Sequence, residues 1–448
     1  MATALYCAQV AAQEAAPAWK QELDALRALV ESQQATIGQL QSEVTTLRDE
    51  LSRDAAAGSP VTISPPAGDS TSSIAVADPA KVPLPSPKPS PEFSFTHEEW
   101  AFEVYGYVKI DAAYDTNHTH NGDFARYVLP GSRDNQLSIT ARQTRLGLAV
   151  TGPDWDDWRP GARIETDFYG NASGSTPELR MRLAYAQMEK DGWLIRAGQD
   201  WDALTVELPK TVNFATYNNQ GALWSRRPLI KAQWQGDAGP GEFKIIGAVA
   251  SAVSGDLDGS GQLDGKDSGV PNLEATVVYE LPLGNEWSAL VALGGAYGQS
   301  AFDLPLGGED VYNSSVGMLT GALEWTGHAK LMGSIWAGEN IACFGGAVGQ
   351  SVNLVKGTAI GARGGWVQLQ TFPFERLNWN LAFGLDDPLD GDLNPGMRNY
   401  NLDASTSLYY QLTSYLTLAA EYSYLETGYK NAPNAMAHRI QTSAFVEF

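Results

Sequence analysis

Cysteine, histidine and long apolar runs are all scarce in this chain of 448 residues. The two cysteines, Cys7 and Cys343, are too few for a disulfide framework. No stretch approaches the roughly 18 consecutive apolar residues that a membrane-spanning helix needs. The sequence also contains no Gly-x-Ser-x-Gly, His-Glu-x-x-His or phosphate-loop motif. We therefore expect a non-enzymatic protein that requires no cofactor.

Basic residues are also in short supply, with 30 Lys and Arg against 52 Asp and Glu. The formal net charge of -22 argues against nucleic acid as a partner. Mean hydropathy is -0.24, while glycine, at 45 residues, is abundant. A polar average is typical of a membrane β-barrel, because only every second strand residue faces lipid.

The N-terminal fifth of the chain is divided into three segments. Residues 1–18 resemble part of an export signal: they have small residues suited to cleavage but no basic start and no full apolar run. Residues 19–54 have heptad spacing and predict a coiled coil, with an ordinary amphipathic helix as the alternative. Residues 55–96 are proline-rich and predict an extended linker. The heptad positions are Leu23, Leu26, Val30, Gln33, Ile37, Leu40, Val44, Leu47 and Leu51.

From residue 97 to 448 the apolar pattern has a period of two, which predicts an all-β transmembrane barrel of sixteen antiparallel strands. The expected strands are 102–115, 135–151, 159–170, 178–190, 193–201, 221–235, 242–254, 272–284, 286–299, 313–327, 329–339, 357–371, 376–387, 398–412, 415–428 and 436–448.

The connections between these strands alternate between long and short, as in bacterial outer-membrane barrels. The long connections are expected outside the cell and the short turns in the periplasm, with outer-membrane lipid and lipopolysaccharide around the wall. An even strand number places both termini on the periplasmic side, so the coiled coil would lie in the periplasm. A soluble β-sandwich or propeller explains neither this alternation nor the absence of a repeat.

Alternation within the strands also predicts which side chains face lipid. Leu146 and Leu148 fall on one apolar face, and Leu179, Met181, Leu183 and Tyr185 form another. The basic residues of the second to sixth strands fall on the opposite face, because an arginine facing lipid at the midplane costs about 2–4 kcal/mol. They form a candidate basic wall, and the alternative is structural pairing with Glu165 or Asp167. The wall comprises Arg145, Arg163, Arg180, Arg182, Arg196, Arg227 and Lys231.

The long connection from Asp202 to Gln220 is too apolar for an exposed loop. We expect it to fold into the barrel, where Asp202 and Glu207 would face the arginines across a narrow opening. Guanidinium groups there would bind carboxylate or phosphate oxygens in a bidentate way. The alternative is an external loop packed on a neighbouring subunit.

Five stretches carry a resemblance to general trimeric bacterial porins, and to the DcaP-like porins of dicarboxylate uptake. They are Tyr105–Asp111, Gln143–Gly147, Ala197–Trp201, Arg226–Lys231 and the terminal Phe448. The resemblance implies a periplasmic coiled coil before a 16-stranded barrel, a homotrimer, and passive uptake of small anionic solutes. It also implies Arg145, Arg196 and Arg227 as the pore-lining bases. The chain departs from the family at Ala444 and Val446, where further aromatic residues are usual.

A second motif lies in the long connection 255–271. Its spacing matches a calcium-binding EF-hand loop, with Asp in place of the usual final Glu and a glycine at position six. The alternative is an acidic outer loop that keeps the surface hydrated. The candidate Ca²⁺ ligands are Asp256, Asp258, Ser260, Gln262, Asp264 and Asp267.

Three functions remain open at this point. The first is a trimeric diffusion porin for small anions, including dicarboxylates. The second is a phosphate- or polyphosphate-selective channel, which the same arginines would serve. The third is a structural outer-membrane anchor whose coiled coil and linker hold the envelope together.

Overall fold

The structure is a computed structural model that describes residues 93–448, except 132–133, 171–175, 253 and 305–307. The predicted export segment, the coiled coil and almost all of the proline-rich linker lie outside the described residues. Among the described residues, no helix is long and apolar enough to cross a membrane.

The described chain is built almost entirely from antiparallel strands. They are β1 (Ser94–His97), β2 (Trp100–Asp115), β3 (Gln136–Thr140), β4 (Arg145–Thr151), β5 (Arg159–Asp167), β6 (Arg180–Lys190), β7 (Trp193–Trp201), β8 (Arg226–Ala238), β9 (Gly241–Ala250), β10 (Asn272–Leu283), β11 (Trp287–Asp303), β12 (Glu309–Trp325), β13 (Ala329–Glu339), β14 (Val352–Asn353), β15 (Thr358–Ala359), β16 (Gly361–Phe374), β17 (Leu377–Pro388), β18 (Arg398–Gln411), β19 (Leu416–Tyr429) and β20 (Ala432–Glu447). The described helices are α3 (Asp264–Asp267), η2 (Ala342–Phe344), η3 (Ala347–Gly349) and η4 (Asp390–Asp392).

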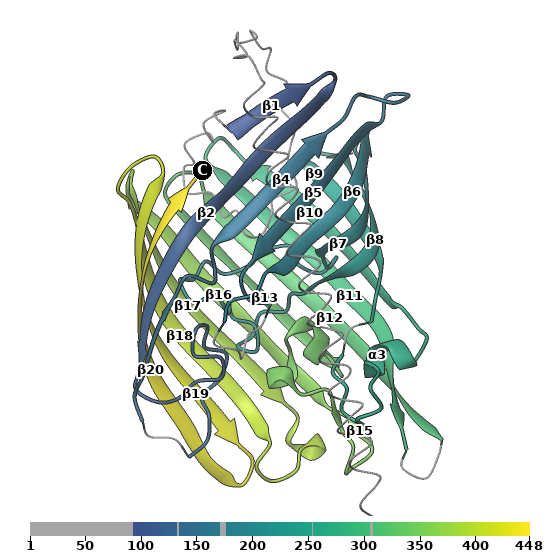
Figure 1. The fold of residues 1–448 in the computed structure, drawn as a ribbon, viewed down its shortest axis with the longest axis vertical. Coiled ribbons are helices and arrows are strands. Elements are labelled where there is room, and N and C mark those ends of the chain that lie inside the picture. Colours follow the sequence, from purple (N-terminus) through teal and green to yellow (C-terminus); the bar gives the residue numbers. More distant parts are fainter. Residues whose placement is uncertain (1–92, 132–133, 171–175, 253, 305–307) are drawn as a thin grey trace, which may run out of the picture. The chain divides into compact units, whose positions relative to one another are not determined.

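The main sheet closes on itself because β20 pairs with β2 (Figure 1). It contains eighteen strands. β3 and β4 together take one position beside β2, and β1 pairs with the first residues of β2. Sixteen strand positions therefore form the barrel, which confirms the strand number predicted from the sequence.

At two places the strands are arranged differently from the prediction, beyond shifts of a few residues at strand ends. The expected strand 135–151 is broken at Ala141–Thr144, so β3 and β4 pair with successive parts of β2. The linker was expected to reach residue 96, but Ser94–His97 form β1 and extend the sheet at the start of β2.

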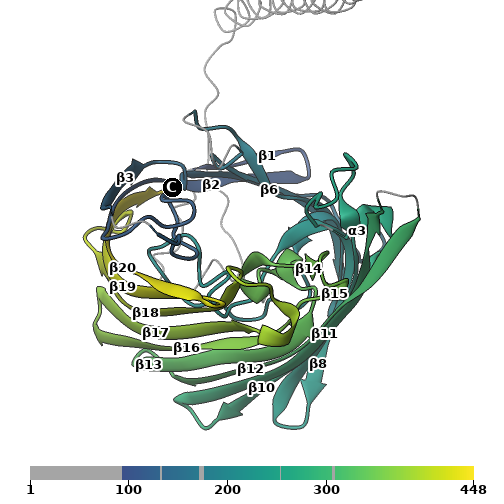
Figure 2. The same cartoon turned by 90° about the horizontal axis from the view of Figure 1, so that it is seen from below.

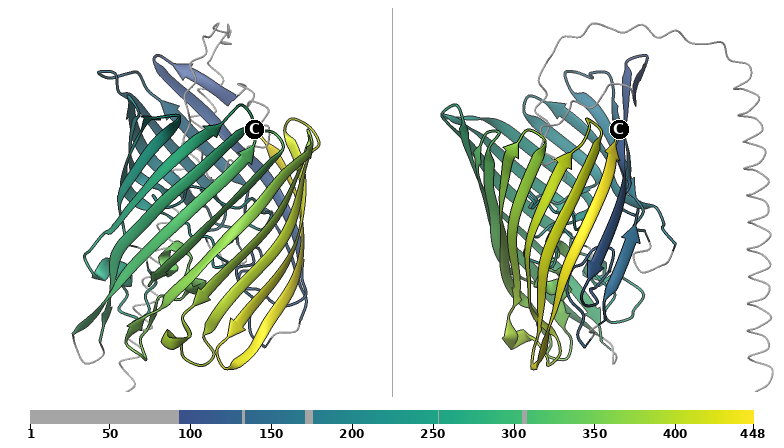
Figure 3. Two further views of the ribbon diagram at one scale, coloured as in Figure 1. Left: turned by 180° about the vertical axis from the view of Figure 1, so that it is seen from behind. Right: turned by 90° about the vertical axis from the view of Figure 1, so that its left-hand side faces the viewer.

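The outer surface of the barrel carries large apolar side chains on alternate strand positions. Exposed examples from around the wall are Val108, Ile110, Ile164, Ile230, Leu293 and Ile335. The strands that carry them run obliquely around the barrel, as the two views in Figure 3 show. A closed antiparallel sheet with an apolar exterior satisfies its backbone hydrogen bonds internally and can face lipid.

A register shift in β6 contradicts part of the predicted lipid-facing stripe. Glu165 pairs with Leu183, whereas Thr166 pairs with Met181, so Arg182 is an extra residue in β6. This bulge reverses the alternation beyond it. Met181 stays exposed, but Leu183 is 2% and Tyr185 is 6% exposed. The prediction that Leu183 and Tyr185 face lipid is therefore wrong.

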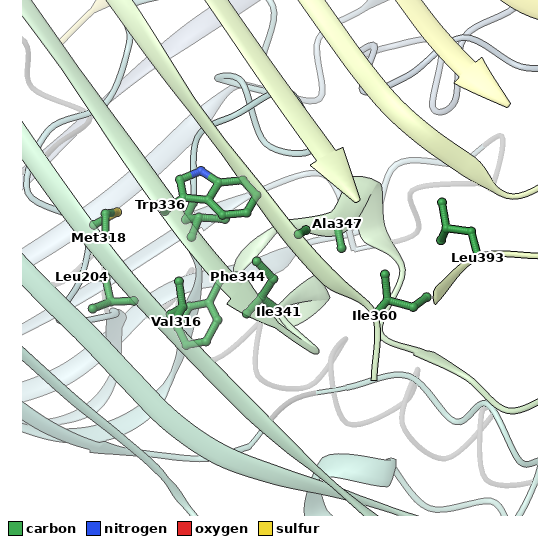
Figure 4. Close-up of a cluster of buried hydrophobic side chains, with 11 residues drawn as sticks. Leu204, Val316, Met318, Trp336, Ile341, Phe344, Ala347, Ile360 and Leu393 are labelled. Atoms are coloured by element: carbon green, nitrogen blue, oxygen red, sulfur yellow. The ribbon is translucent and has the colours of Figure 1, made fainter. Parts of the chain in front are cut away.

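Loops folded into the barrel give it an apolar core, which the alternation of the strands did not predict. Leu204 lies in one buried cluster with Trp336 of β13 and Phe344 of η2 (Figure 4), and Leu223 belongs to the same cluster. The indole N–H of Trp336 donates a hydrogen bond to the Gly221 carbonyl oxygen at 2.7 Å. The connection between β13 and β16, with η2 and η3, thus holds the loop between β7 and β8 in place.

Candidate functional site

The loop between β7 and β8, residues 202–225, lies inside the barrel, as the view along the barrel in Figure 2 shows. We call it the inserted loop. The Glu421 carboxylate of β19 accepts hydrogen bonds from the backbone N–H of Val212 at 2.6 Å and of Asn213 at 3.1 Å. Gln368 of β16 bonds both the backbone N–H and the carbonyl oxygen of Lys210. These contacts confirm that the loop folds inward, and the alternative of an external loop is wrong.

Asp202 fastens the two ends of the inserted loop together. Its Oδ1 accepts hydrogen bonds from the backbone N–H groups of Leu204 and Thr205, and its Oδ2 accepts one from Ser225 N–H at 2.6 Å. Ser225 Oγ in turn accepts a hydrogen bond from Arg227 at 2.7 Å. The acidic residue expected to face the arginines is thus occupied by the backbone of its own loop.

Glu207 also has a partner other than the predicted arginines. Its Oε1 lies 2.6 Å from Nζ of Lys330 on β13. β13 is not a neighbour of β7 or β8 in the sheet. The ion pair therefore ties the inserted loop to a distant part of the wall.

Three predicted arginines converge on Glu165 and Asp167 of β5. Arg182 Nε lies 2.6 Å from Glu165 and its Nη1 lies 3.1 Å from Asp167. Arg180 binds Asp167 in a bidentate way, at 2.9 and 2.6 Å. Arg145 Nε lies 3.4 Å from Glu165. The pairing of arginines with Glu165 and Asp167, which the sequence analysis left open as an alternative, is therefore present.

A fourth guanidinium, that of Arg226 at the start of β8, completes this group. It lies within electrostatic range of Arg180, Arg182 and Asp167. Its guanidinium carbon is 5.0 Å from the ring centroid of Trp201 and 5.6 Å from that of Trp224. Within the described part of the chain Arg226 forms no ion pair, and its Nη1 is buried without a hydrogen-bond partner. We call Arg145, Arg180, Arg182 and Arg226 the arginine cluster.

Arg226 was missed because alternation along β8 assigns it to the face opposite Arg227. β6 and β7 pair only as far as Ala184 and Gln199, so beyond that point β7 and β8 continue without β6 beside them. Of the two tryptophans that lie beside Arg226, Trp201 directly precedes the inserted loop and Trp224 lies at its end. Their position is the one signal in the sequence that could have identified it.

A second basic group lies on β7 and β8. Nη1 of Arg196 and Nζ of Lys231 share the Asp200 carboxylate, at 3.0 and 2.6 Å. The Arg196 guanidinium also lies 4.5 Å from the centroid of the Tyr185 ring. That contact exists because the bulge in β6 turns Tyr185 inward.

Exposure separates the predicted basic wall into two sets. Arg227 is 1% exposed, beneath Phe344 and 3.7 Å from Glu274, so it does not line an open surface as predicted. The Arg182 side chain is likewise 2% exposed. The Arg180 side chain, at 31%, is accessible, and Arg163 and Arg196 are partly accessible.

Three of the candidate calcium ligands between β9 and β10 lie close together. One carboxylate oxygen from each of Asp256, Asp258 and Asp264 lies within 4.8 Å of the others. Asp267, the remaining carboxylate of the motif, does not belong to this group. Asp267 lies on the short helix α3, although no helix was expected beside the motif.

No protein-family model matches the chain, and no curated protein matches its sequence. Solved structures do match. The outer membrane channel DcaP of Acinetobacter baumannii aligns with a TM-score of 0.64 at 20% identity, over 79% of this chain and 99% of that one. An anion-selective porin from Comamonas acidovorans aligns with a TM-score of 0.53 at 15% identity, over 78% and 100%. OprB of Pseudomonas putida aligns with a TM-score of 0.53 at 11% identity, over 78% and 94%.

The fold is that of outer-membrane channels. The resemblance to DcaP-like porins noted from short sequence stretches is thus confirmed at the level of the fold.

Proposed function

We propose that the chain is an outer-membrane porin for the passive diffusion of small anionic solutes, dicarboxylates among them. The observation that carries the proposal is the charge of the arginine cluster, in which four guanidinium groups surround two carboxylates inside a closed barrel. The excess positive charge beside the inserted loop attracts anions and repels cations. By this proposal the protein is not an enzyme and works as a homotrimer in the outer membrane.

The accessible members of the basic wall have different roles from the buried ones. Arg180 of the wall and Arg226, which the wall did not include, are the groups that meet the solute, with Arg163 and Arg196 further along the wall. Arg182 and Arg227 are held by Glu165 and Ser225 and position the others. A guanidinium without a carboxylate partner can bind a carboxylate or phosphate in a bidentate way. Arg226, packed beside Trp201 and Trp224, forms no ion pair among the described residues.

The test is the reversal potential of the purified protein in planar lipid bilayers under a KCl gradient. Wild type is expected to be anion-selective, and Arg226→Gln and Arg180→Gln are each expected to reduce the ratio of anion to cation permeability. Arg159→Gln is the control, because Arg159 is exposed and pairs with the exposed Asp154. Cation selectivity of the wild-type channel would refute the proposal.

Competition of the chloride current separates the two anion hypotheses. Succinate is expected to reduce the current at lower concentration than phosphate if the channel serves dicarboxylates. The reverse order would favour the phosphate or polyphosphate channel.

The anchor hypothesis is separated by a different pair of results. No conductance at all, together with detachment of the envelope on deletion of residues 19–95, would favour a structural role. The apolar exterior of the barrel serves both functions, but a net positive charge inside the barrel serves only a channel.

A further inference from the structure

We propose that the loop between β9 and β10 holds one Ca²⁺ ion, bound by Asp256, Asp258 and Asp264, and that the ion fixes this loop to the end of β11. This site is separate from the proposed permeation path and does not depend on it. It takes a hard divalent cation from the surrounding medium.

The three carboxylates are already close enough to share one ion. One oxygen from each lies within 4.8 Å of the others. Ca²⁺ binds oxygen at about 2.3–2.6 Å, so ligands on opposite sides of the ion are roughly 4.6–5.2 Å apart. The separation of these oxygens is therefore within the range that one Ca²⁺ ion can bridge.

The Asp264 side chain provides an independent indication of a missing cation. It is 0% exposed, and its Oδ2 accepts a hydrogen bond from Leu257 N–H at 3.1 Å. Its Oδ1 is buried and has no hydrogen-bond partner among the described residues. A buried carboxylate oxygen without a partner is costly, and coordination of a metal ion removes that cost.

The charges around Asp264 have the same sign. Asp258, Asp256 and Asp267 lie close enough to Asp264 for their negative charges to repel its carboxylate. Among the described residues none of these four carboxylates forms an ion pair with Lys or Arg. A divalent cation would neutralise this local excess of negative charge.

The loop backbone has the conformation that the EF-hand spacing requires. Gly261, at position six, has φ of 86°, where a side chain would be strained. The chain enters α3 at Asp264, position nine of the motif. Ser260 directly precedes Gly261 and Gln262 directly follows it, so Ser260 Oγ and the Gln262 carbonyl oxygen are candidates for further ligands.

The site is connected to the barrel wall through Asp258. Its Oδ2 accepts a hydrogen bond from the backbone N–H of Asp303, the last residue of β11, at 2.6 Å. An ion that orders Asp258 therefore also orders the contact between the β9–β10 loop and the end of β11. Lys266, exposed on α3, is a trypsin site within the ordered segment.

The experiment measures trypsin cleavage after Lys266 in the full-length protein in detergent, with CaCl₂ or MgCl₂ added to metal-free buffer. Ca²⁺ is expected to slow cleavage at least tenfold, with half-saturation on the order of 10⁻⁴–10⁻³ M, as in extracellular calcium modules. Mg²⁺ is expected to protect weakly, since it demands near-ideal octahedral geometry. Calorimetry with CaCl₂ is expected to give one ion per chain.

Asp264→Asn is expected to abolish protection, and Asp237→Asn, at the exposed end of β8, is the matched control. Unchanged heat-modifiable gel mobility of both variants shows that the barrel is intact. The proposal is overturned if wild type shows no saturable Ca²⁺ protection, if Asp264→Asn retains it, or if Mg²⁺ protects equally well, because each result describes an acidic surface without a site.

Discussion

Lys330 of β13 and Glu207 of the inserted loop form an ion pair with a distance of 2.6 Å between Nζ and Oε1. Both side chains are largely buried, so water screens the pair only in part. The pair holds the middle of the loop to the wall, while Glu421 holds the segment around Val212. The position of the loop thus depends on a few charged contacts from distant strands.

We expect Lys330→Met to loosen the inserted loop. Glu207 would lose its partner at a cost of about 1–3 kcal/mol and move towards water. Single-channel recording should show a larger mean conductance and more frequent current fluctuations. Lys244→Met, which removes a wall contact of 3.9 Å to Glu280 away from the loop, should leave the conductance unchanged. Equal conductance in both variants would contradict the anchoring role.

Different substitutions in the arginine cluster should affect either the stability or the anion selectivity of the protein. Arg182→Gln leaves the buried Glu165 and Asp167 short of a partner, and we expect a loss of about 3–5 kcal/mol in stability. Arg226→Gln removes no ion pair, so the unfolding temperature should change little while anion selectivity falls. Thermal unfolding followed by heat-modifiable gel mobility tests both. A stable Arg182→Gln variant would argue against the structural role assigned to Arg182.

Anion selectivity should decline as pH rises through about 7. Burial lowers the pKa of Lys210 in the inserted loop to about 7. Its Nζ lies 4.4 Å from the centroid of the Tyr409 ring and has no hydrogen-bond partner among the described residues. Lys210 is therefore positive below about pH 7 and neutral above it. Reversal potentials from pH 5 to 9 should show this step, and Lys210→Met should remove it. A step that persists in the variant would belong to another group.

Gly198 of β7 should tolerate no side chain. Its φ is 134°, and an added Cβ would lie 2.2 Å from the Ala184 carbonyl oxygen beside the β6 bulge. We expect Gly198→Ala to cost on the order of 1–3 kcal/mol and to lower the unfolding temperature. Gly247→Ala in β9, where an added Cβ meets no atom within 4 Å, is the control. Equal unfolding temperatures would show that the strand relaxes at Gly198.

The strand number could be predicted because period-two alternation and turn residues are local properties of the chain. The bulge at Arg182 could not, because it depends on how β5 and β6 align across the sheet. Because of this one extra residue, the prediction placed Leu183 and Tyr185 on the lipid-facing side, whereas in the structure both are buried. Local patterns determine which segments become strands, and register determines where their side chains point.

The candidate site could be predicted in residue type but not in pairing. The alternation of apolar and polar residues correctly placed most of the arginines on the inner face of the barrel. Which arginine stays accessible depends on contacts between segments far apart in the sequence, such as Phe344 over Arg227 and the two tryptophans around Arg226. Exposure of a side chain inside a barrel is decided by the loops that fold over it.

The pairing of β2 with β20 has a consequence for biogenesis. Arg439 donates to Asp115 at 2.7 Å across 324 positions of the chain, and neither side chain is exposed. This contact cannot form until nearly the whole polypeptide has left the ribosome. Until then two strand edges and two unmatched charges stay open to other chains. The topology itself therefore leaves the first hairpins without a closing strand until β20 is available.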